Sequence, residues 1–545
     1  MKNRNANIRI VSFTLAVILG MAGLGFVPHF ELLGMEFERV DILSSLRADD
    51  ATAVAEEFHT PDFELLEQEL AVAEAQISDT ATIAEPIPVR YEWVVSEAPA
   101  HNPQRLRSQD IAIASTSVLD FEDFDTLATT RLDNFISKLA NGESVRIAFM
   151  GDSFVEGDIL TSDLREELQS RFGGRGAGFV SADIPFATVR KSIKRTSSNW
   201  KTYSVMKRKE ATESVRERFF ISGYLAEGRA NATTRWQATN AFPNLDSCTR
   251  ARILLISRDT SRVEVTLCDT LRKEFLIAGD ERVRHIDIEA PADDIRIRVL
   301  EGNILCYGTS METSGGVIVD NFSVRSNNGH AIFGTSATVN RQIDEILGYD
   351  LVVLQYGLNI MQQGQRVYAK YRDQLRDMIA YAERCFPNAA IVVLGVSDRW
   401  VKNADTGAYE PIGSVDALTS YQRAAADSCK VAFWNTSRIM SSMGGMPTFV
   451  SNGWAARDYT HINYAGGRRI ARALSESILQ RVYNKLVEME EEAMRIEAER
   501  QRELEERRLK AEEHLSNQID AVTPIIDSVE WSSISSAHNH KTASE

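Results

Sequence analysis

Residues 146–160 read RIAFMGDSFVEGDIL, and this stretch decides the expected fold. The apolar run from Val145 to Met150 predicts a buried strand that stops at Gly151-Asp152-Ser153. After the turn, apolar residues recur at every fourth position, which predicts one face of a helix: Leu160, Leu164, Leu168 and Phe172. A strand, a short turn and an amphipathic helix form the opening unit of an open α/β sheet. The serine in the turn is therefore either a helix cap or a nucleophile.

The same α/β pattern returns in the second half of the chain. Helices are predicted over 123–142, 366–384 and 464–480, and further apolar strands over 316–324, 350–357, 389–397 and 431–437. Continuously apolar strands that alternate with helices indicate a parallel sheet covered on both faces. We therefore expect an α/β protein with a three-layer αβα parallel sheet. Ligands of such sheets bind at the carboxyl ends of the strands.

The stretch from about 195 to 320 has a different pattern. It consists of short alternating runs separated by Asp, Gly, Asn and Pro, and it shows no long helix: ERFFISGYLAEG, ARILLISRD, RVEVTLCD, RHIDIEA and DIRIRVLEG. This spacing is typical of a β-sandwich. The sequence therefore predicts a β-sandwich domain inserted into the α/β domain.

The flanking segments differ in composition from both domains. Residues 31–120 are rich in Ala, Glu, Asp and Thr with scattered prolines, which predicts an extended spacer. Beyond about residue 486, acidic and basic residues alternate without an apolar seam, which predicts a solvated helix that could bind a protein partner. The expected organisation is a signal anchor or signal peptide (1–30), the spacer (31–120), the first part of the α/β domain (121–195), the inserted β-sandwich (196–319), the second part of the α/β domain (320–485), and a charged helix with a disordered tail (486–545).

The N-terminus carries a membrane signal. Lys2, Arg4 and Arg9 precede an apolar run over 10–27, which fits either a signal-peptide core or a short membrane span. The sequence FVPHFELL that follows offers no small-x-small cleavage site, so an uncleaved anchor is favoured over a cleaved signal peptide. The body is then expected to be exported to the periplasm or cell envelope and tethered to the inner membrane.

Composition excludes some classes of function. The chain has 61 Lys and Arg against 77 Asp and Glu, and its net charge of −16 argues against a nucleic-acid partner. The five cysteines form no CxxC or zinc-ligand pattern, so neither a metal site nor a cofactor is expected. Cys248, Cys268 and Cys306 fall in one region, where one disulfide could form in an oxidising compartment. Otherwise these thiols are expected to be small buried side chains.

Three polar stretches fall at predicted strand ends or just before the last helix: Gly151-Asp152-Ser153, Gly357-Leu358-Asn359 and Asp458-Tyr459-Thr460-His461. A serine is a weak nucleophile that needs a neighbouring base, and the base needs a group to orient it. His461 and Asp458 can supply both, because three-residue spacing lets the two side chains point the same way. The backbone N–H of Ser153 and the side-chain amide of Asn359 suit an oxyanion hole.

Each stretch alone also has a structural interpretation as a turn or helix cap. Of the nine histidines, only His330 and His461 fall in the α/β domain, and the others lie in the predicted tails, spacer or β-insert: His29, His59, His101, His285, His514, His538 and His540. The occurrence of all three stretches, in order and at strand ends, favours the catalytic interpretation.

The ordered set GDS, GLN and DYTH resembles the SGNH (GDSL-type) hydrolase family over roughly residues 126–195 and 320–480. The resemblance implies that Ser153 is the nucleophile, that Asn359 is an oxyanion-hole donor, and that Asp458 and His461 complete the catalytic set. It implies no metal or cofactor.

The resemblance also implies a backbone N–H donor within residues 319–333, VDNFSVRSNNGHAIF. Counting from Asp320 indicates Ser326, whereas the small residue before the next apolar run indicates Gly329. A backbone donor requires only space and a suitable φ/ψ, so both residues stay open as candidates.

A β-rich segment between the nucleophile and this block is similar to the layout of exported bacterial peptidoglycan O-acetylesterases, whose inserted domain resembles a carbohydrate-binding module. The resemblance implies a serine esterase that removes O-acetyl groups from a cell-envelope polysaccharide such as peptidoglycan, through an acetyl-serine intermediate. Two alternatives stay open. One is an exported polysaccharide O-acetyltransferase with the same catalytic residues. The other is a non-catalytic glycan-binding scaffold of the envelope. A scaffold would have no physical need for the complete catalytic set of Ser153, Asn359, Asp458 and His461.

Overall fold

Strand β5 (Val145–Gly151) forms from the apolar run that precedes Ser153, and all seven of its residues are buried. It lies between two strands of a six-stranded sheet whose order is β15-β5-β16-β17-β20-β4. The other strands are β15 (Val317–Ser323), β16 (Leu351–Gln355), β17 (Ala390–Leu394), β20 (Ala432–Trp434) and β4 (Glu122–Asp123). The first five strands are parallel, and only β4 is antiparallel to its neighbour. This confirms the predicted α/β class with a parallel sheet.

The computed structural model describes residues 30–32, 35–37, 89–96, 106–112, 118–185 and 190–527. The apolar run over 10–27, most of the predicted spacer and the tail beyond residue 527 lie outside the described residues. Within the described ranges, none of the helices combines the length and the apolar character needed to cross a membrane.

The direction in which the chain crosses the sheet reverses at β5. From β5 the chain goes to β15 on one side, and it then returns to β16, β17 and β20 on the other side. Because crossovers between parallel strands are right-handed, connections that run in opposite directions place their helices on opposite faces. Helix α4 (Thr161–Phe172) therefore covers one face, and the other face carries α6 (Ala337–Leu347), α7 (Ala369–Cys385) and α8 (Val415–Cys429). Open α/β sheets bind ligands at the carboxyl ends of the strands beside such a reversal.

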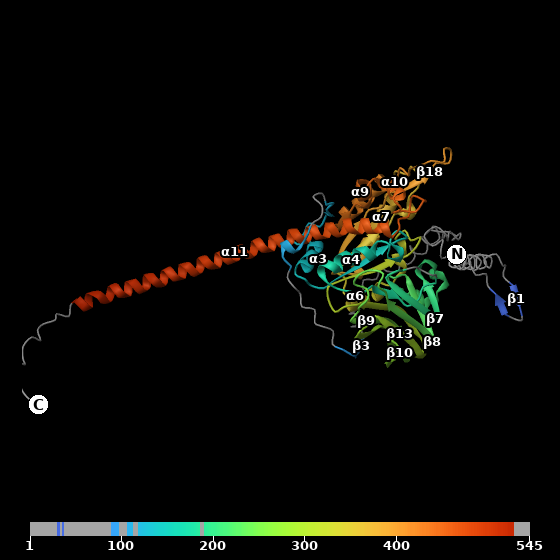
Figure 1. Cartoon of the computed structure of the whole chain (residues 1–545), viewed down its shortest axis with the longest axis horizontal. Coiled ribbons are helices and arrows are strands. Elements are labelled where there is room, and N and C mark those ends of the chain that lie inside the picture. The colour runs from blue at the N-terminus through green and yellow to red at the C-terminus, as the bar shows by residue number, and fades with distance from the viewer. Residues whose placement is uncertain are drawn as a thin grey trace, which may run out of the picture.

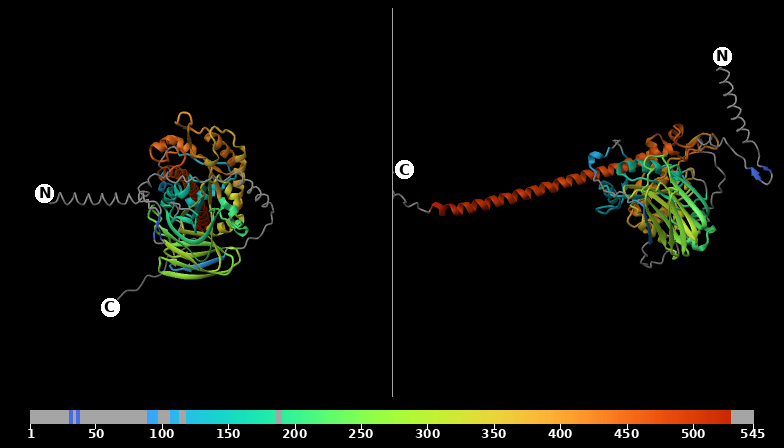
Figure 2. Two further views of the ribbon diagram at one scale, coloured as in Figure 1. Left: turned by 90° about the vertical axis from the view of Figure 1, so that its right-hand side faces the viewer. Right: turned by 60° about the horizontal axis from the view of Figure 1, so that its bottom comes forward.

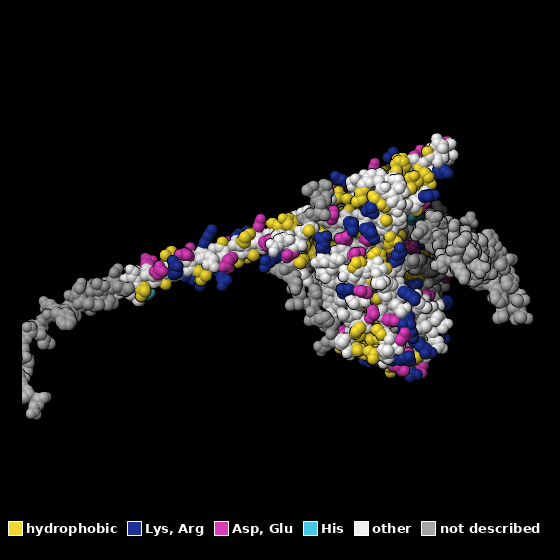
Figure 3. Space-filling view, viewed as in Figure 1, with side chains coloured by type: hydrophobic (Ala, Val, Ile, Leu, Met, Phe, Trp, Pro, Cys, Tyr) yellow, Lys and Arg dark blue, Asp and Glu magenta, His cyan; other side chains and the backbone are white. Residues whose placement is uncertain are grey.

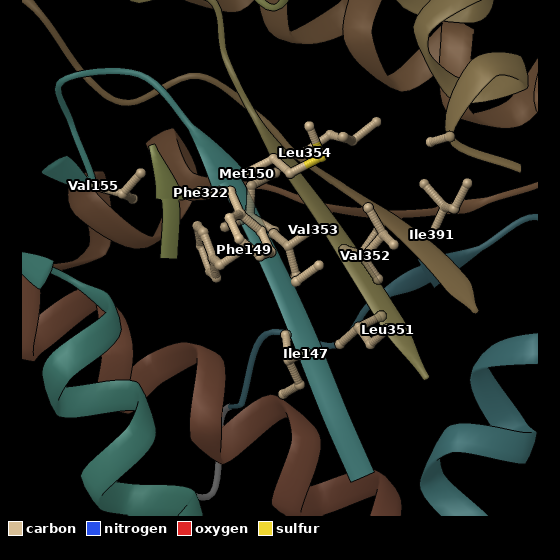
Figure 4. Packing of buried hydrophobic residues seen from close by; sticks show 14 of the residues in the cluster. Ile147, Phe149, Met150, Val155, Phe322, Leu351, Val352, Val353, Leu354 and Ile391 are labelled. Atoms are coloured by element: carbon tan, nitrogen blue, oxygen red, sulfur yellow. The ribbon is translucent and has the colours of Figure 1, made fainter. Parts of the chain in front are cut away.

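Apolar side chains of the parallel sheet form the main core. Figure 4 shows how residues of β5, such as Ile147 and Phe149, lie beside Leu351 and Val353 of β16. On the face of the sheet that α4 covers, Leu164 of α4 packs on these strands together with the first part of the final helix, α11 (Tyr464–Asp527). Helix α3 (Arg131–Ala140) and this final helix also contact each other.

A second, branched sheet contains ten strands in the order β11-β10-β13-β8-β14-β9-β12-β3, with β6 paired to β14 and β7 to β8. Its strands are β3 (Val89–Val94), β6 (Gly178–Ser181), β7 (Ile193–Ser204), β8 (Tyr224–Ala238), β9 (Arg250–Ser257), β10 (Ser261–Leu267), β11 (Leu271–Ile277), β12 (Val283–Glu289), β13 (Asp294–Glu301) and β14 (Ile304–Glu312). They form the lower part of the body in Figure 1 and enclose an apolar core of their own. The assignment of this sheet as an inserted carbohydrate-binding-like domain stays a prediction.

Three features of this sheet differ from the sequence-based expectation. Strand β3 comes from the predicted spacer and pairs in parallel with β12, because its alternating Tyr91 and Trp93 pack against Phe275. Strand β6 lies inside the segment expected to belong to the α/β domain. Residues 213–216 form the short helix α5 (Glu213–Arg216), so the strand expected over 217–228 begins only at Tyr224.

A buried ionic network connects the two sheets. Arg146 of β5 donates from Nε to Asp320 of β15 at 2.7 Å and from Nη1 to Glu312 of β14 at 2.6 Å, and Arg252 of β9 also pairs with Glu312. Burial alone would raise the pKa of Glu312, but the two guanidiniums outweigh it and lower the pKa to about 2. The network therefore fixes the β-rich sheet against the edge of the parallel sheet that carries β5 and β15.

Helix α11 (Tyr464–Asp527) is continuous over 64 residues, whereas two separate helices were expected on either side of residue 485. Its first part packs on α3 and α4, and the rest projects from the body (Figures 1 and 2). Side chains over 491–518 are exposed, and positive and negative groups alternate along them (Figure 3). The expected solvated charged helix is thus an extension of a core helix.

The remaining described elements are short: β1 (Phe30–Leu32), β2 (Met35–Phe37), the hairpin β18 (Trp400–Lys402) and β19 (Tyr409–Pro411), α9 (Thr436–Ser442) and α10 (Gly445–Ser451). All five cysteines are free thiols, so the disulfide considered for the 248–306 region does not form. Cys248, Cys306 and Cys385 are buried, as expected for small apolar side chains, whereas Cys268 is exposed and Cys429 is half-buried.

Candidate active site

The turn after β5 presents Ser153 at the carboxyl end of the parallel sheet. A side chain at Gly151 would place its Cβ 2.3 Å from Val155 Cγ2, so only glycine allows the chain to turn this tightly. Asp152 is fully buried and accepts a hydrogen bond from the Phe154 N–H at 2.9 Å. With Asp152 directed inward, the neighbouring Ser153 side chain is directed toward the solvent and stays partly exposed.

Ser153, His461 and Asp458 form a continuous hydrogen-bonded chain. Ser153 Oγ lies 3.1 Å from His461 Nε2, although the two residues are 308 positions apart in the sequence. His461 Nδ1 lies 2.7 Å from Asp458 Oδ2. The structure thus brings together the three residues that the sequence assigned to the nucleophile, the base and the orienting carboxylate.

Hydrogen bonds keep Asp458 ionised. Its Oδ1 accepts the backbone N–H groups of Thr460 and His461, at 2.9 and 3.0 Å. Partial burial raises the pKa of Asp458, but these hydrogen bonds and the contact with the His461 ring outweigh it and lower the pKa to about 2. A carboxylate that stays charged at neutral pH can stabilise an imidazolium.

The loop that carries His461 is fixed at several backbone positions. The Ala456 N–H donates to the His461 carbonyl at 2.7 Å, and the Trp400 N–H donates to the Tyr459 carbonyl at 3.0 Å. Tyr459 adopts a left-handed conformation with φ of 54°, and its ring stacks on Tyr409 of β19 at a centroid distance of 3.9 Å. These contacts hold the short segment between Asp458 and His461 in its turn.

Close packing between α11 and the nucleophile turn sets the distance from Ser153 to His461. Tyr464 donates its hydroxyl hydrogen to the Gly157 carbonyl at 2.6 Å. A Cβ at Gly467 would lie 1.8 Å from the Ile159 carbonyl oxygen, so the helix reaches the turn only because this residue is glycine. These positioning residues were not predicted from the sequence. Their only signal was a Gly-Gly pair, Gly466-Gly467, near the start of a predicted helix.

Asn359 lies in the 3₁₀ turn η5 (Leu358–Ile360) that follows β16. Its Nδ2 donates to Asp152 Oδ2 at 3.2 Å and to the Asn327 carbonyl at 2.9 Å. The amide is thereby placed next to the residue that precedes Ser153. Burial raises the pKa of Asp152 to about 7, although the Phe154 N–H and the nearby His461 act in the opposite direction.

The two candidates for the second backbone donor differ in their surroundings. The Gly329 N–H donates to Asn327 Oδ1 at 2.8 Å, and a Cβ at Gly329 would lie 2.2 Å from Met378 Cε. Gly329 is therefore tightly packed, and its N–H already donates a hydrogen bond within the protein. Ser326 is partly exposed, has a left-handed φ of 59°, and follows β15, whose Ser323 is in register with Gly151.

A solved structure of a peptidoglycan O-acetylesterase shares this architecture. The similarity covers 67% of this chain and 99% of that one, with a TM-score of 0.55 and 21% sequence identity. The chain therefore shares the fold of that esterase. No protein-family model and no curated protein matches the sequence.

Two further solved structures are similar to parts of this chain. A family two carbohydrate esterase from Cellvibrio japonicus has 10% identity and a TM-score of 0.23, with coverage of 53% of this chain and 98% of that one. A putative GDSL-like lipase from Parabacteroides merdae ATCC 43184 has 16% identity and a TM-score of 0.22, with coverage of 30% and 74%.

The described residues contain no candidate metal site. Across those ranges, no three His, Cys, Asp or Glu side chains converge in a way that could hold a metal ion.

Proposed function

We propose that this protein is a serine esterase that removes O-acetyl groups from a cell-envelope polysaccharide such as peptidoglycan. The observation that carries the proposal is the chain of contacts from Ser153 Oγ through the His461 ring to the Asp458 carboxylate. Such an arrangement activates a hydroxyl for attack on an ester carbonyl.

In the first step, His461 Nε2 removes the proton of Ser153 while Oγ attacks the acetyl carbonyl. The Nδ1–H of the imidazolium then faces the Asp458 carboxylate, which stabilises the positive charge. His461 next gives the proton to the leaving sugar oxygen, and an acetyl-serine is formed. In the second step, His461 removes a proton from a water molecule, whose oxygen attacks the acetyl carbonyl. The bond between Ser153 Oγ and the acetyl group breaks, acetate leaves, and His461 returns the proton to Ser153.

The negative charge that develops on the carbonyl oxygen requires hydrogen-bond donors. We assign this role to the Ser153 backbone N–H and to Asn359 Nδ2. As the further donor we favour Ser326 N–H, because the Gly329 N–H already donates to Asn327 Oδ1. Of the two hydrogen bonds that Asn359 Nδ2 donates, the longer one is to Asp152 Oδ2, at 3.2 Å. We expect the substrate oxygen to accept a hydrogen bond from this same N–H. Hydrogen bonds of this kind often tighten only when the substrate is bound.

The polysaccharide substrate is inferred from the fold neighbour and from the accessibility of the site. The solved structure that shares the fold is a peptidoglycan O-acetylesterase. The side chains of Asp458 and His461 are 45% and 46% exposed, so a bulky polymer can reach the reacting atoms. An exported, membrane-tethered location completes the proposal and rests on the sequence of residues 1–30.

The test is acetate release from O-acetylated peptidoglycan by the wild-type protein and by Ser153→Ala. We expect the wild type to release acetate and the variant to lose at least about 10³-fold in kcat, because the nucleophile is absent. Ser441→Ala, which removes an exposed serine of α9, is the matched control and should retain wild-type activity.

Full activity of Ser153→Ala would reject the catalytic assignment. Transfer of acetyl groups to an added oligosaccharide without release of acetate would instead identify an O-acetyltransferase with the same catalytic residues. Absence of both reactions in the wild type, with glycan binding retained, would identify a non-catalytic scaffold.

A further inference from the structure

A polar cavity lies beside the nucleophile turn, between the parallel sheet and the β-rich sheet. Its volume is about 240 Å³, and it is lined by residues of both sheets. The parallel-sheet side contributes Glu156 and Asp158, from the turn after Ser153, and Asn321 of β15. The other side contributes Arg190, together with Arg195 of β7 and Tyr224 of β8.

The cavity adjoins the turn that carries the reacting serine. Glu156 is three residues beyond Ser153, and Asn321 Nδ2 donates to the Val155 carbonyl at 2.8 Å within the same turn. Ser323, which also lines the cavity, is in register with Gly151 of β5. A polymer held with an acetyl group at Ser153 would therefore place a neighbouring unit at this cavity.

The two carboxylates that line the cavity are neutralised by arginines. Asp158 is fully buried and pairs with Arg165 at 3.3 Å and with Arg190 at 2.7 Å. Glu156 pairs with Arg325 at 2.8 Å, and only 13% of the Glu156 side chain is exposed. Neither carboxylate is free to bind a cationic ligand.

Arg195 also lines the cavity, and neither Asp158 nor Glu156 forms an ion pair with it. Within the described residues, its guanidinium forms no ion pair and no hydrogen bond, although its side chain is partly buried. Burial lowers the pKa of Arg195, and the charge of Asp183 acts in the opposite direction. A guanidinium stays charged in proteins and offers five N–H donors in a planar fork. In a chain with a net charge of −16, this cavity presents a local positive charge with donors to spare.

We propose that this cavity is a subsite for a carboxylate of the polysaccharide, on a sugar adjacent to the one that carries the acetyl group. Arg195 binds this carboxylate through two parallel N–H donors, which is the geometry that arginine and carboxylates favour. The inference rests on the proposed esterase function and deepens it, because it names an acidic glycan as the substrate class.

The experiment compares acetate release from two substrates of equal length, O-acetylated oligoglucuronate and neutral O-acetylated xylo-oligosaccharide. The readout is the ratio of kcat/KM for the acidic over the neutral substrate. We expect Arg195→Gln to lower this ratio about 10- to 100-fold, because a charge-assisted contact is lost. Arg195→Lys should lower it less, because the charge is kept and the fork is lost.

Arg229→Gln is the matched control, because it removes a positive charge from an exposed position on β8 that does not line the cavity. Its ratio should equal that of the wild type. Turnover of p-nitrophenyl acetate reports whether each variant has a folded catalytic centre. A measurement on the wild type alone is independent of any variant: added NaCl should raise KM for the acidic substrate and leave KM for the neutral one unaffected.

An unchanged ratio in Arg195→Gln, or equal salt dependence for both substrates, would overturn the subsite while leaving the esterase function in place. A wild type that releases acetate from neither glycan and does not turn over p-nitrophenyl acetate would overturn the proposed function, and the subsite with it. The two failures are thus distinguishable.

Discussion

At the scale of single residues, the site depends on charges whose protonation is set by their surroundings. Asp458 and Asp152 lie on either side of the Ser153–His461 contact, and the fold shifts their pKa values in opposite directions. Asp458 is kept ionised by three hydrogen bonds, whereas Asp152 is fully buried and favours its neutral form. The two carboxylates therefore support different predictions.

Asp458→Asn should lower kcat by about 10³- to 10⁴-fold, because an amide neither fixes the imidazole tautomer nor stabilises its cation. Steady-state hydrolysis of p-nitrophenyl acetate measures this. Asp405→Asn, an exposed position in the β18–β19 loop, is the control and should behave as the wild type. Activity of Asp458→Asn within a factor of two of the wild type would show that the carboxylate does not serve the histidine.

Asp152→Asn should stabilise the protein more at pH 8 than at pH 4. The folded-state pKa of about 7 exceeds the ordinary value of 3.8, so the folded protein holds a proton that the unfolded chain has already released. Unfolding free energy of the wild type therefore falls as pH rises from about 4 to 7, by up to about 4 kcal/mol, and the variant lacks this loss. Urea unfolding at both pH values measures the difference. Parallel pH profiles of the variant and the wild type would contradict it.

At the scale of elements, the catalytic distance depends on how closely α11 approaches the turn after β5. The sequence predicted both elements, because a buried strand and an amphipathic helix each leave a strong periodic pattern. It also predicted that Ser153, Asn359, Asp458 and His461 lie near strand ends. The close approach at Gly467 was not predictable, since it depends on the crossing of two elements far apart in the sequence. For the same reason, spacing could not distinguish Ser326 from Gly329, and only the packing of Gly329 against Met378 separates them.

Gly467→Ala should reduce both activity and stability. The added Cβ would lie 1.8 Å from the Ile159 carbonyl oxygen, so α11 must move away from the nucleophile turn and carry His461 with it. We expect a loss of about 1–3 kcal/mol in unfolding free energy and a fall in kcat of at least tenfold. Ala498→Ser enlarges an exposed residue of the same helix and should change neither quantity. A fully active Gly467→Ala would show that this contact does not set the catalytic geometry.

At the scale of the whole molecule, two large sheets and one long helix dominate the described structure. Buried arginines connect the sheets, and the first part of α11 completes the core, while residues 491–518 of the helix are exposed. The sequence indicated the change from an α/β pattern to a β-rich one, because alternation differs from continuous apolar runs. It did not indicate that β3 joins the second sheet or that the charged helix continues α11, since both facts depend on contacts between distant segments. The cavity beside Arg195 was not predictable for the same reason, because it lies at the boundary between the two sheets and is lined by distant segments.

Truncation after residue 490 should leave the catalytic unit intact. The removed side chains over 491–518 are exposed, so we expect kcat to be unchanged and the unfolding free energy to change by about 0.5 kcal/mol or less. Thermal unfolding and acetate release measure both quantities. Truncation after residue 473 is the contrasting variant, because it also removes the buried Leu474, Ile478 and Val482 and should prevent stable folding. Loss of activity in the variant truncated after residue 490 would show that the projecting part of the helix has a role in catalysis.

The most direct test of the central claim is to identify the residue that is acetylated during turnover. The wild-type protein is quenched with acid during hydrolysis of p-nitrophenyl acetate, and its peptides are analysed by mass spectrometry. The account predicts an acetyl group on Ser153 in the wild type and no acetylated serine in Ser153→Ala. Acetylation of a different residue together with continued turnover by Ser153→Ala would contradict it.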